Sequence, residues 1–284
     1  MDALRIALVT ETYPPEINGV AMTLGRLVDG LRARGQHVSL IRPKRRHGST
    51  AERNADECLV TGLPIPGYAG LNFGLSSKRR LAAAWRTTRP DIVHIATEGP
   101  LGWSALRAAR SLNLPVVASF HTNFHNYSRY YGLGWLQRPL NAYLRGFHNR
   151  ARLTLAPTRT LAERLETDGY RNLGVMARGV DTAAFHPQRR DPALRQSWGV
   201  AADDPALIYV GRLAPEKNLS LLVDTFRAIQ AVRPGSRLVM VGNGPELRRL
   251  RQEHPDFILA GPRTGEDLAR HYASADLFLF PSLT

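Results

Sequence analysis

Residues 206–232, ALIYVGRLAPEKNLSLLVDTFRAIQAV, show in its clearest form the pattern that decides the fold. Residues 206–210 are a short apolar run without polar alternation, which is typical of a parallel strand buried on both faces. A polar loop follows, and residues 219–232 then repeat apolar residues at the spacing of a helix with one buried side. The stretch therefore predicts a strand, a loop and a helix, the unit from which parallel α/β sheets are built.

The same alternation of short strands and amphipathic helices runs along most of the chain. The run RIALVT at 5–10 is followed by a helical pattern at 20–34 that Gly35 ends. Residues 43–57 and 61–74 break the pattern with proline, glycine and charge, so we expect loops there. Further strands are expected at 37–41, 92–96, 116–120 and 153–156, and further helices at 75–87, 101–111 and 136–150.

A second series of elements begins after the arginine-rich stretch 187–192, whose composition suits a linker. The sequence therefore predicts the α/β class, with two Rossmann-like doubly wound domains at residues 1–186 and 187–284. The strands of the second series are expected at 206–210, 237–241, 257–260 and 276–280, and its helices at 219–232, 245–252 and 265–274.

The end of the sequence interrupts this pattern. The last expected strand, DLFLF at 276–280, is followed by four residues and by no helix that could cover it. The second domain also has fewer expected strands than the first. We therefore expect an incomplete second domain, and a sequence that is a C-terminal truncation of a longer protein.

The composition excludes several classes of protein. Of the 284 residues, 43% are hydrophobic and 22% are charged, which argues for a globular protein and against disorder and coiled coil. No stretch approaches the roughly 18 apolar residues of a membrane-spanning helix, and the N-terminus turns acidic before a signal-peptide core develops, so a cytoplasmic protein is expected. The single cysteine, Cys58, excludes an internal disulfide and a cysteine-based zinc ribbon.

The charge is strongly positive, with 38 Lys and Arg against 24 Asp and Glu and a formal net charge of +14. Such a chain favours polyanions: nucleic acid, an anionic membrane surface or a phosphorylated small molecule. Basic runs lie at 44–46, 78–80 and 248–249, but they lack the interleaved aromatic residues that stack on bases. We therefore expect no nucleic acid partner. The runs are either solvated faces or a means of docking on an anionic membrane surface.

Two loops that follow expected strands contain glycine where the backbone could approach a ligand. In ETYPPEINGV at 11–20, Gly19 stands where the loop enters a helix, at the positive end of the helix dipole. In VGNGPE at 241–246, Gly242 and Gly244 join a strand to a helix. The alternative is that these glycines only serve the turns. No G-x-G-x-x-G follows the first strand, which argues against a nicotinamide or flavin enzyme.

His121 is the first residue after the strand expected at 116–120, at the edge where open α/β sheets place ligand groups. The alternative is a histidine that packs in the core or caps a turn. His121 and His125 have no carboxylate at metal-ligand spacing, so the sequence predicts no metal centre.

The loop VGRLAPEKN at 210–218 presents Arg212 and Lys217 five residues apart across a turn. A planar guanidinium and a mobile ammonium together suit a diphosphate. The alternative is that both are surface charges beside Glu216.

Six segments together carry a family resemblance: ETYPPEINGV, FHTNFHNYSRYYG, ARGVDTAAFHP, VGRLAPEKN, VGNGPE and ADLFLFPSLT. In this order they resemble the family-4 retaining glycosyltransferases of GT-B architecture, in particular the bacterial branch of mannosyltransferases and of sulfoquinovosyl- and glucosyl-lipid synthases. The resemblance spans almost all of the chain. It implies two Rossmann-like domains that face a cleft, with the acceptor bound by the first domain and a nucleotide sugar by the second.

The resemblance also implies roles for single residues. Gly19 would provide a backbone contact at the reaction cleft, and His121 would be a catalytic residue that contacts the transferred sugar near its 6-position. Arg212 and Lys217 would hold the donor diphosphate and stabilise the leaving nucleotide, which makes them catalytic as well as donor-binding. The run at 178–181 resembles the interdomain hinge segment. The further donor-binding residues implied are Gly242, Gly244, Gly261, Arg263 and Ser282.

The sequence departs from the family's pattern at its end. In the family, PS-x-x is followed by E-x7-E, whose carboxylates contact the donor sugar and the ribose, but the sequence stops at Thr284. The resemblance therefore implies a polypeptide that binds donor poorly or fails to turn over.

The activity implied by the resemblance is transfer of a hexose, with mannose preferred, to a hydroxyl of a lipid or glycan, with retention and without metal or cofactor. GDP-mannose is the expected donor, and a UDP-sugar is the alternative. A lipid acceptor fits the basic charge and the loop residues Tyr68, Leu71, Phe73 and Trp135, which could equally pack between domains. The expected location is cytoplasmic, peripheral on the inner face of the plasma membrane.

Two alternatives remain open at this point. One is a nucleotide-sugar 2-epimerase of the same fold, which would need a pair of catalytic carboxylates that the sequence does not reveal. The other is a non-catalytic fragment that docks at membranes or binds nucleic acid.

Overall fold

The computed structural model describes residues 3–16, 18–44, 56–64, 72–75, 77–121 and 137–282. The chain forms two compact units. Of the described residues, those up to 121 and those at 137–178 belong to unit 1, and those at 179–282 belong to unit 2. The domain boundary expected between residues 186 and 187 stays a prediction.

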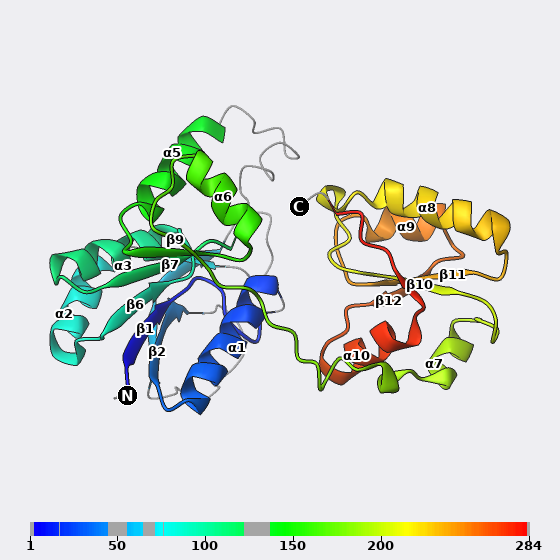
Figure 1. The fold of residues 1–284 in the computed structure, drawn as a ribbon, viewed down its shortest axis with the longest axis horizontal. Coiled ribbons are helices and arrows are strands. Elements are labelled where there is room, and N and C mark those ends of the chain that lie inside the picture. The colour runs from blue at the N-terminus through cyan, green and yellow to red at the C-terminus, as the bar shows by residue number, and fades with distance from the viewer. Residues whose placement is uncertain are drawn as a thin grey trace. The chain divides into compact units, whose positions relative to one another are not determined.

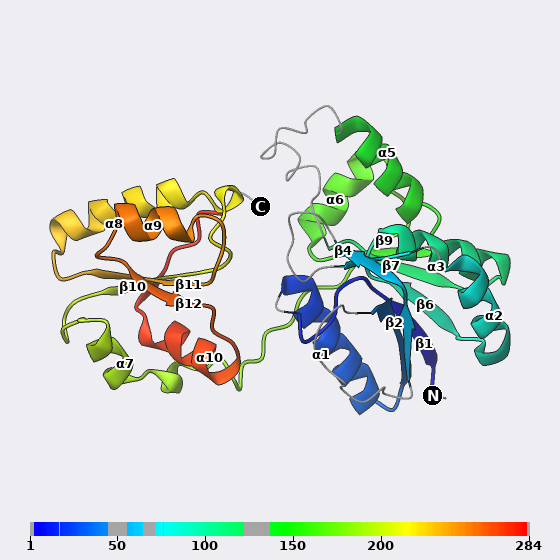
Figure 2. The same ribbon diagram turned by 180° about the vertical axis from the view of Figure 1, so that it is seen from behind.

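Unit 1 is built on a parallel sheet (Figures 1 and 2). Within the described residues this sheet has seven strands in the order β3-β2-β1-β6-β7-β8-β9. In chain order they span Arg5–Val9, His37–Pro43, Glu57–Val60, Ile92–Ile95, Val116–Ser119, Leu153–Ala156 and Leu173–Val175. The sheet is therefore doubly wound, and its strand order reverses between β1 and β6, where such sheets place ligands.

Helices cover both faces of this sheet, which explains why its strands are continuously apolar. The helices of unit 1 are α1 (Gly19–Ala33), α2 (Lys78–Thr88), α3 (Pro100–Ser111), α5 (Gln137–His148) and α6 (Arg159–Thr167). Ala7 and Val9 of β1 belong to the core cluster that includes α2 and α3. Ile6 and Leu8 point to the opposite face and pack with α1. Since successive side chains of a strand alternate between faces, both halves of the run are buried.

The loop after β1 determines where α1 begins. Asn18 Oδ1 accepts the N–H of Ala21 at 2.9 Å, and Asn18 Nδ2 donates to Thr12 Oγ1 at 2.7 Å. The side chain of Asn18 thus caps the helix and ties it to the loop. Gly35, with φ +75°, follows the other end. With Asn18 as the cap, α1 begins at Gly19, one residue before the predicted start at residue 20.

The segment 61–74, expected as a loop, contains two strands, β4 (Gly62–Pro64) and β5 (Asn72–Gly74), which pair as an antiparallel hairpin. The prediction of a loop at 61–74 is therefore wrong at 62–64 and at 72–74. Gly74 of this hairpin lies so close to α3 that a Cβ atom there would stand 2.8 Å from Leu101 Cβ, so the contact requires glycine. The loop expected at 43–57 overlaps only the first residue of β3 (Glu57–Val60), the edge strand of the sheet.

Glu11 joins three elements of unit 1 directly after β1. Its N–H donates to Thr97 Oγ1 at 3.0 Å, and its carboxylate accepts the N–H groups of Gly74 and Leu101, each at 3.3 Å. Leu101 lies in the first turn of α3, whose N-cap residue is a glycine, so Glu11 caps this helix from another strand. Burial raises the pKa of Glu11 to about 7; the two hydrogen bonds oppose this shift, and the charge of Glu98 adds to it.

Unit 2 repeats the same plan on a smaller scale. Its described residues form a parallel sheet of four strands in the order β12-β11-β10-β13, spanning Ile258–Gly261, Arg237–Val241, Ala206–Val210 and Leu277–Phe278. Its helices α7, α8, α9 and α10 span Pro192–Ser197, Leu219–Val232, Leu247–Glu253 and Gly265–Ser274. α8 and α9 cover one face and α7 and α10 cover the other (Figure 1).

The sequence predicts the longer elements well and the shortest ones poorly. Strands at 206–210 and 237–241 and helices at 219–232 and 265–274 have the predicted bounds. The sequence pattern does not reveal α6, α7 or β9. These are short segments, which hydrophobic periodicity alone does not distinguish from loops.

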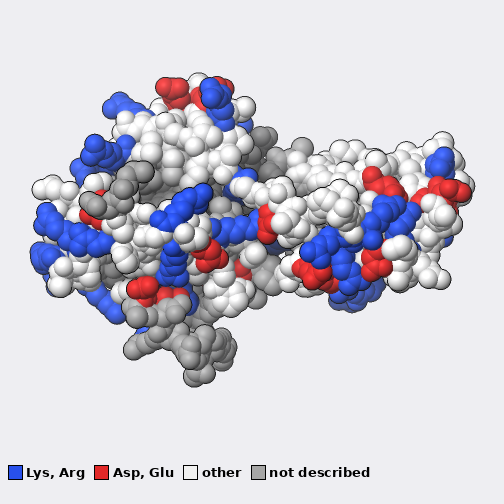
Figure 3. Space-filling model, turned by 60° about the horizontal axis from the view of Figure 1, so that its bottom comes forward, with Lys and Arg blue, Asp and Glu red and all other residues white. Residues whose placement is uncertain are grey.

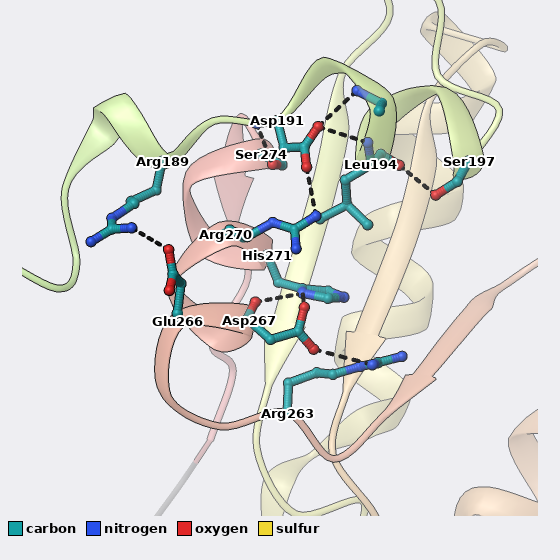
Figure 4. Close-up of polar contacts among 11 residues, drawn as sticks. Arg189, Asp191, Leu194, Ser197, Arg263, Glu266, Asp267, Arg270, His271 and Ser274 are labelled. Carbon is teal, nitrogen blue, oxygen red and sulfur yellow. Dashed lines mark hydrogen bonds and ion pairs between the residues drawn. The ribbon is translucent and has the colours of Figure 1, made fainter.

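Ion pairs attach the segment before α7 to α10 (Figure 4). Asp191 accepts the first two N–H groups of α7 at 2.8 and 3.2 Å and pairs with Arg270 of α10 at 2.6 Å. Arg189, in the 3-10 helix η2 (Pro187–Arg189), pairs with Glu266 of α10. Since these pairs are exposed, each stabilises only modestly, and together they mainly determine where the chain enters unit 2.

Two neighbouring leucines of α8 provide a matched test of the core of unit 2, because Leu222 is 1% exposed and Leu221 is 49% exposed. We expect Leu222→Ala to lower the free energy of unfolding by about 2–5 kcal/mol, since it leaves a cavity. Leu221→Ala should change it by less than about 0.5 kcal/mol. Urea denaturation followed by circular dichroism measures both values, and equal losses would contradict the packing described for α8.

Glu11 predicts a pH-dependent stability. Because its pKa rises from 4.5 in the unfolded chain to about 7 in the fold, the fold binds the proton more tightly and loses stability as pH rises through this window. Glu11→Gln keeps an oxygen for the two N–H groups and removes the titration. Its stability relative to the wild type should therefore grow by about 2–4 kcal/mol between pH 4.5 and pH 7.5.

Urea denaturation at both pH values tests this expectation. The same substitution at the exposed Glu163 of α6 is the control. A stability difference that does not change with pH would show that Glu11 titrates normally.

Candidate functional site

The strand ends of unit 2 bring the predicted donor-binding residues to one edge. Because the sheet is parallel, the loops after β10, β11, β12 and β13 all leave from its carboxyl edge. In strand order the predicted residues are Arg212 and Lys217, Gly242 and Gly244, Gly261 and Arg263, and Ser282. Their convergence follows from the topology, and their role in binding stays a prediction.

Backbone hydrogen bonds join these loops to one another. Leu213 N–H donates to Asn243 O at 2.9 Å, and Glu246 N–H donates back to Leu213 O at 3.0 Å. Gly242 N–H donates to Gly261 O at 2.9 Å. The loops after β10, β11 and β12 therefore form one hydrogen-bonded layer above the sheet.

The two glycines after β11 are required by contact between these loops. Gly242 has φ +142°, and a Cβ atom there would lie 1.9 Å from Gly211 O. A Cβ atom on Gly244 would lie 2.2 Å from Leu213 O. Any side chain would thus push the loop after β10 away. Both glycines position the loop that carries Arg212, whether or not they also touch a ligand.

Arg212 and Lys217 occupy the centre of this edge. Lys217 Nζ lies 3.3 Å from Ser282 Oγ, which follows β13. Arg212 Nη1 lies 3.7 Å from Glu216 Oε1. The Arg212 side chain is 38% exposed, whereas that of Glu216 is 1% exposed. The alternative that Arg212 and Lys217 are surface charges beside a surface Glu216 does not fit, because the Glu216 side chain is buried.

The environment of Lys217 favours an arriving anion. Burial lowers the pKa of Lys217; the charge of Glu216 counteracts this shift, and the charge of Arg212 adds to it. An anion that binds both cations would relieve the repulsion between them. The pair is therefore suited to a diphosphate.

The loop after β12 presents main chain more than side chain. Arg263 Nε donates to Ala260 O at 3.0 Å, and Arg263 Nη1 pairs with Asp267 Oδ2 at 3.1 Å (Figure 4). Gly261 has φ +72°, with open space where a side chain would stand. A ligand at this loop would therefore meet the backbone of Gly261, while the Arg263 guanidinium is engaged within unit 2.

In unit 1, His121 follows β7 at the carboxyl edge of the sheet. Burial, together with the charges of Arg178 and His94, lowers its pKa to about 4, so the imidazole is neutral near pH 7. Within the part of the chain that the structure describes, its buried Nε2 has no hydrogen-bond partner. Since buried polar atoms are normally bonded, this nitrogen is available to a ligand hydroxyl.

Arg178 brings Gly19 and His121 together. Its Nη2 donates to His121 O at 3.5 Å, and its Nη1 lies 3.8 Å from the place where a Cβ atom on Gly19 would stand. From the sequence, residue 178 is expected only to belong to the run 178–181 that resembles an interdomain hinge, with no role at a site. A single arginine in a chain with 38 Lys and Arg is too weak a signal to single it out.

Two carboxylates at the reversal point between β1 and β6 also escape the sequence analysis. Each of these strands is followed by Thr-Glu, at 10–11 and at 97–98, and this repetition is the signal that could reveal them. Glu98 is buried and pairs with His148 Nε2 at 3.1 Å. Glu11 accepts backbone N–H groups and Glu98 pairs with His148, so both acids are engaged by other elements of unit 1.

Across the ranges that the structure describes, no group of three His, Cys, Asp or Glu side chains could hold a metal ion. None of the helices in those ranges is long and apolar enough to cross a membrane.

Comparison with known families matches both units. The sequence pattern of Glycosyltransferase Family 4 matches residues 17–184, and that of Glycosyl transferases group 1 matches residues 204–284. The first match alone covers more than half of the chain, and the two together leave only short segments unmatched.

Relatives and a solved structure agree with these matches. The chain is 36% identical over 282 residues to a GDP-mannose-dependent alpha-mannosyltransferase of Mycolicibacterium smegmatis, covering 98% of this chain and 73% of that protein. It is 27% identical over 302 residues to the alpha-monoglucosyldiacylglycerol synthase of Acholeplasma laidlawii, covering 99% and 75%. Sucrose-phosphate synthase of Thermosynechococcus elongatus superposes with a TM-score of 0.73 at 16% identity, covering 98% and 75%. The chain therefore has the GT-B fold, is a glycosyltransferase and belongs to glycosyltransferase family 4.

Proposed function

We propose that this glycosyltransferase moves mannose from GDP-mannose to a hydroxyl of a lipid acceptor, with retention of configuration and without a metal ion. The observation that carries the proposal is the convergence of Arg212, Lys217 and Ser282 at the carboxyl edge of unit 2. The donor is inferred from the GDP-mannose-dependent relative, which is similar along nearly the whole chain. The lipid acceptor is inferred from the diacylglycerol-glycosylating relative.

The transfer exchanges one bond of the sugar for another. The bond between sugar C1 and the donor phosphate oxygen breaks, and a bond between C1 and the acceptor oxygen forms. The acceptor proton passes to a phosphate oxygen of the leaving GDP, so no protein base is required. Negative charge grows on the diphosphate as it leaves, and Arg212 and Lys217 would stabilise this charge more in the transition state than in the ground state.

Two residues of unit 1 would also contact the donor. His121 would bind the transferred sugar, and the backbone at Gly19 would contact the donor phosphate. The neutral imidazole can bind a sugar hydroxyl through the buried Nε2 that has no partner among the described residues. Gly19 places no side chain in the first turn of α1, at the positive end of the helix dipole. The guanine base of the donor would meet the open backbone at Gly261.

The helices of unit 1 suggest how a lipid acceptor is reached. α2, α3 and α5 contain no Asp or Glu, and their Lys and Arg residues are Lys78, Arg79, Arg80, Arg86, Arg107, Arg110, Arg138 and Arg145. Figure 3 shows blue side chains along the left margin of the molecule, where Figure 1 places α2 and α3, while blue and red alternate over unit 2. An unbalanced basic face attracts anionic lipid headgroups. We therefore propose peripheral docking of unit 1 on an anionic membrane surface.

The alternatives have less support. A 2-epimerase needs catalytic carboxylates, and Glu11 and Glu98 are engaged with backbone N–H groups and His148. A non-catalytic binding fragment would bind anions without releasing sugar. A panel of nucleotide sugars separates these functions, since we expect GDP-mannose to be turned over faster than UDP-glucose and to give no epimer.

Removal of either cation should abolish most transfer. Arg212→Ala and Lys217→Ala should each lower kcat/KM about a hundredfold, or about 3 kcal/mol of transition-state stabilisation. The measurement is GDP release from GDP-mannose in the presence of diacylglycerol vesicles. Arg233→Ala, at the exposed end of α8, is the control and should keep full activity. Wild-type turnover in both site variants would refute the site.

Membrane docking predicts salt-sensitive binding to vesicles. Replacing Lys78, Arg79 and Arg80 with glutamine should weaken binding to phosphatidylglycerol vesicles about a hundredfold, at about 1 kcal/mol per charge. A matched variant with glutamine at Arg233, Arg248 and Arg251 of unit 2 should bind like the wild type. Sedimentation at low and high salt measures both. Equal loss in the two variants would mean that net charge, and not the α2 face, causes binding.

A further inference from the structure

Glu216 is a buried carboxylate that no described residue hydrogen-bonds. Its side chain is 1% exposed, and both Oε1 and Oε2 are buried without a hydrogen bond to any described residue. Such a group is costly in a protein interior unless nearby charges compensate for the lost water. Its presence in a hydrogen-bonded loop layer therefore requires an explanation.

Two cationic side chains near Glu216 supply that compensation, and a neutral tyrosine holds the backbone of one of them. Arg212 Nη1 lies 3.7 Å from Oε1, and the adjacent Lys217 experiences the charge of Glu216 as well. From β10, the Tyr209 hydroxyl donates to Arg212 O at 2.9 Å. Burial, and then the charge of Glu216, raise the pKa of Tyr209, so this group stays neutral. The two cations of the proposed donor site are thus the counter-charges of one buried acid.

Arg212 and Lys217 repel each other when both are directed at the same place. Without a ligand, two like charges at one edge would separate, or the lysine would lose its proton. The fixed negative charge of Glu216 beside them reduces this repulsion. Preorganised charges of this kind lower a barrier because they need not reorient during the reaction.

We propose that Glu216 is a positioning residue, whose buried charge holds Arg212 and Lys217 together and charged at the carboxyl edge of unit 2 before the donor diphosphate arrives. Glu216 touches neither donor nor sugar in this role. The inference rests on the proposed function, since it assigns to Glu216 the preparation of the cation pair that receives the diphosphate.

The charge of Glu216 has two opposite effects on a bound diphosphate. It repels the anion directly, and it also keeps the cations in position. Removal of the charge should therefore change GDP affinity little and catalysis strongly. In Glu216→Gln we expect kcat to fall at least about tenfold, while the Kd of GDP changes less than about threefold. The alkaline limb of the kcat profile should move to lower pH, because Lys217 loses its compensating charge.

The experiment compares Glu216→Gln, Glu216→Asp and the control Glu253→Gln, which alters an exposed acid paired with Arg249 on α9. GDP binding is measured by calorimetry, and GDP release from GDP-mannose is measured against pH. Glu216→Asp keeps the charge and should retain the wild-type alkaline limb and more activity than the glutamine variant. If the glutamine variant is unstable, the aspartate variant still tests the inference. It should be folded, more active than the glutamine variant, and unchanged in its alkaline limb.

The possible outcomes separate this inference from the proposed function. If Glu216→Gln matches the wild type in kcat and in pH profile, or if the aspartate variant is no better than the glutamine variant, the positioning role is overturned. If Arg212→Ala binds GDP as well as the wild type, the donor site itself is wrong, whatever Glu216 does. If Arg212→Ala loses GDP binding while Glu216→Gln keeps the wild-type kcat and pH profile, the donor site stands and only the positioning role of Glu216 is refuted.

Discussion

Parallel strand pairing is the constraint on which the rest of this structure depends. Because neighbouring strands run in the same direction, every loop that follows a strand leaves from the same edge, and residues distant in sequence meet there. Lys217 after β10 reaches Ser282 after β13 in this way. Gly242 and Gly244 allow a second contact at this edge. Because they have no side chains, the loop after β11 can touch the loop that carries Arg212.

Buried acids organise the edges of both sheets in a chain of net charge +14. Each acid is compensated differently: Glu11 by backbone N–H groups, Glu98 by His148, and Glu216 by Arg212 and Lys217. In the first two cases the acid holds elements of the fold together. In the third case the compensating groups are the cations proposed to bind the donor, which links the stability of the loop to its function.

Periodicity predicted much of the fold because burial on both faces leaves a plain signal in the sequence. The apolar runs of β1 and β10 and the long helix α8 are strong examples. Periodicity did not predict the hairpin of β4 and β5, because its glycine and proline residues have low strand propensity and its strands are only three residues long. Glu11 looked like a loop residue, and its role as a cap on α3 depends on a helix formed far along the chain.

The sequence by itself determined the class of the fold, the order of its main elements and the loops that carry Arg212, Lys217 and His121, because these follow from local pattern and strand ends. Only the tertiary structure decided which groups are buried beside them. Glu216 beneath the cations, the buried Nε2 of His121 and the position of Arg178 next to Gly19 all result from packing between segments. Burial and distance control charge and hydrogen bonding, and neither quantity can be obtained from the order of residues alone.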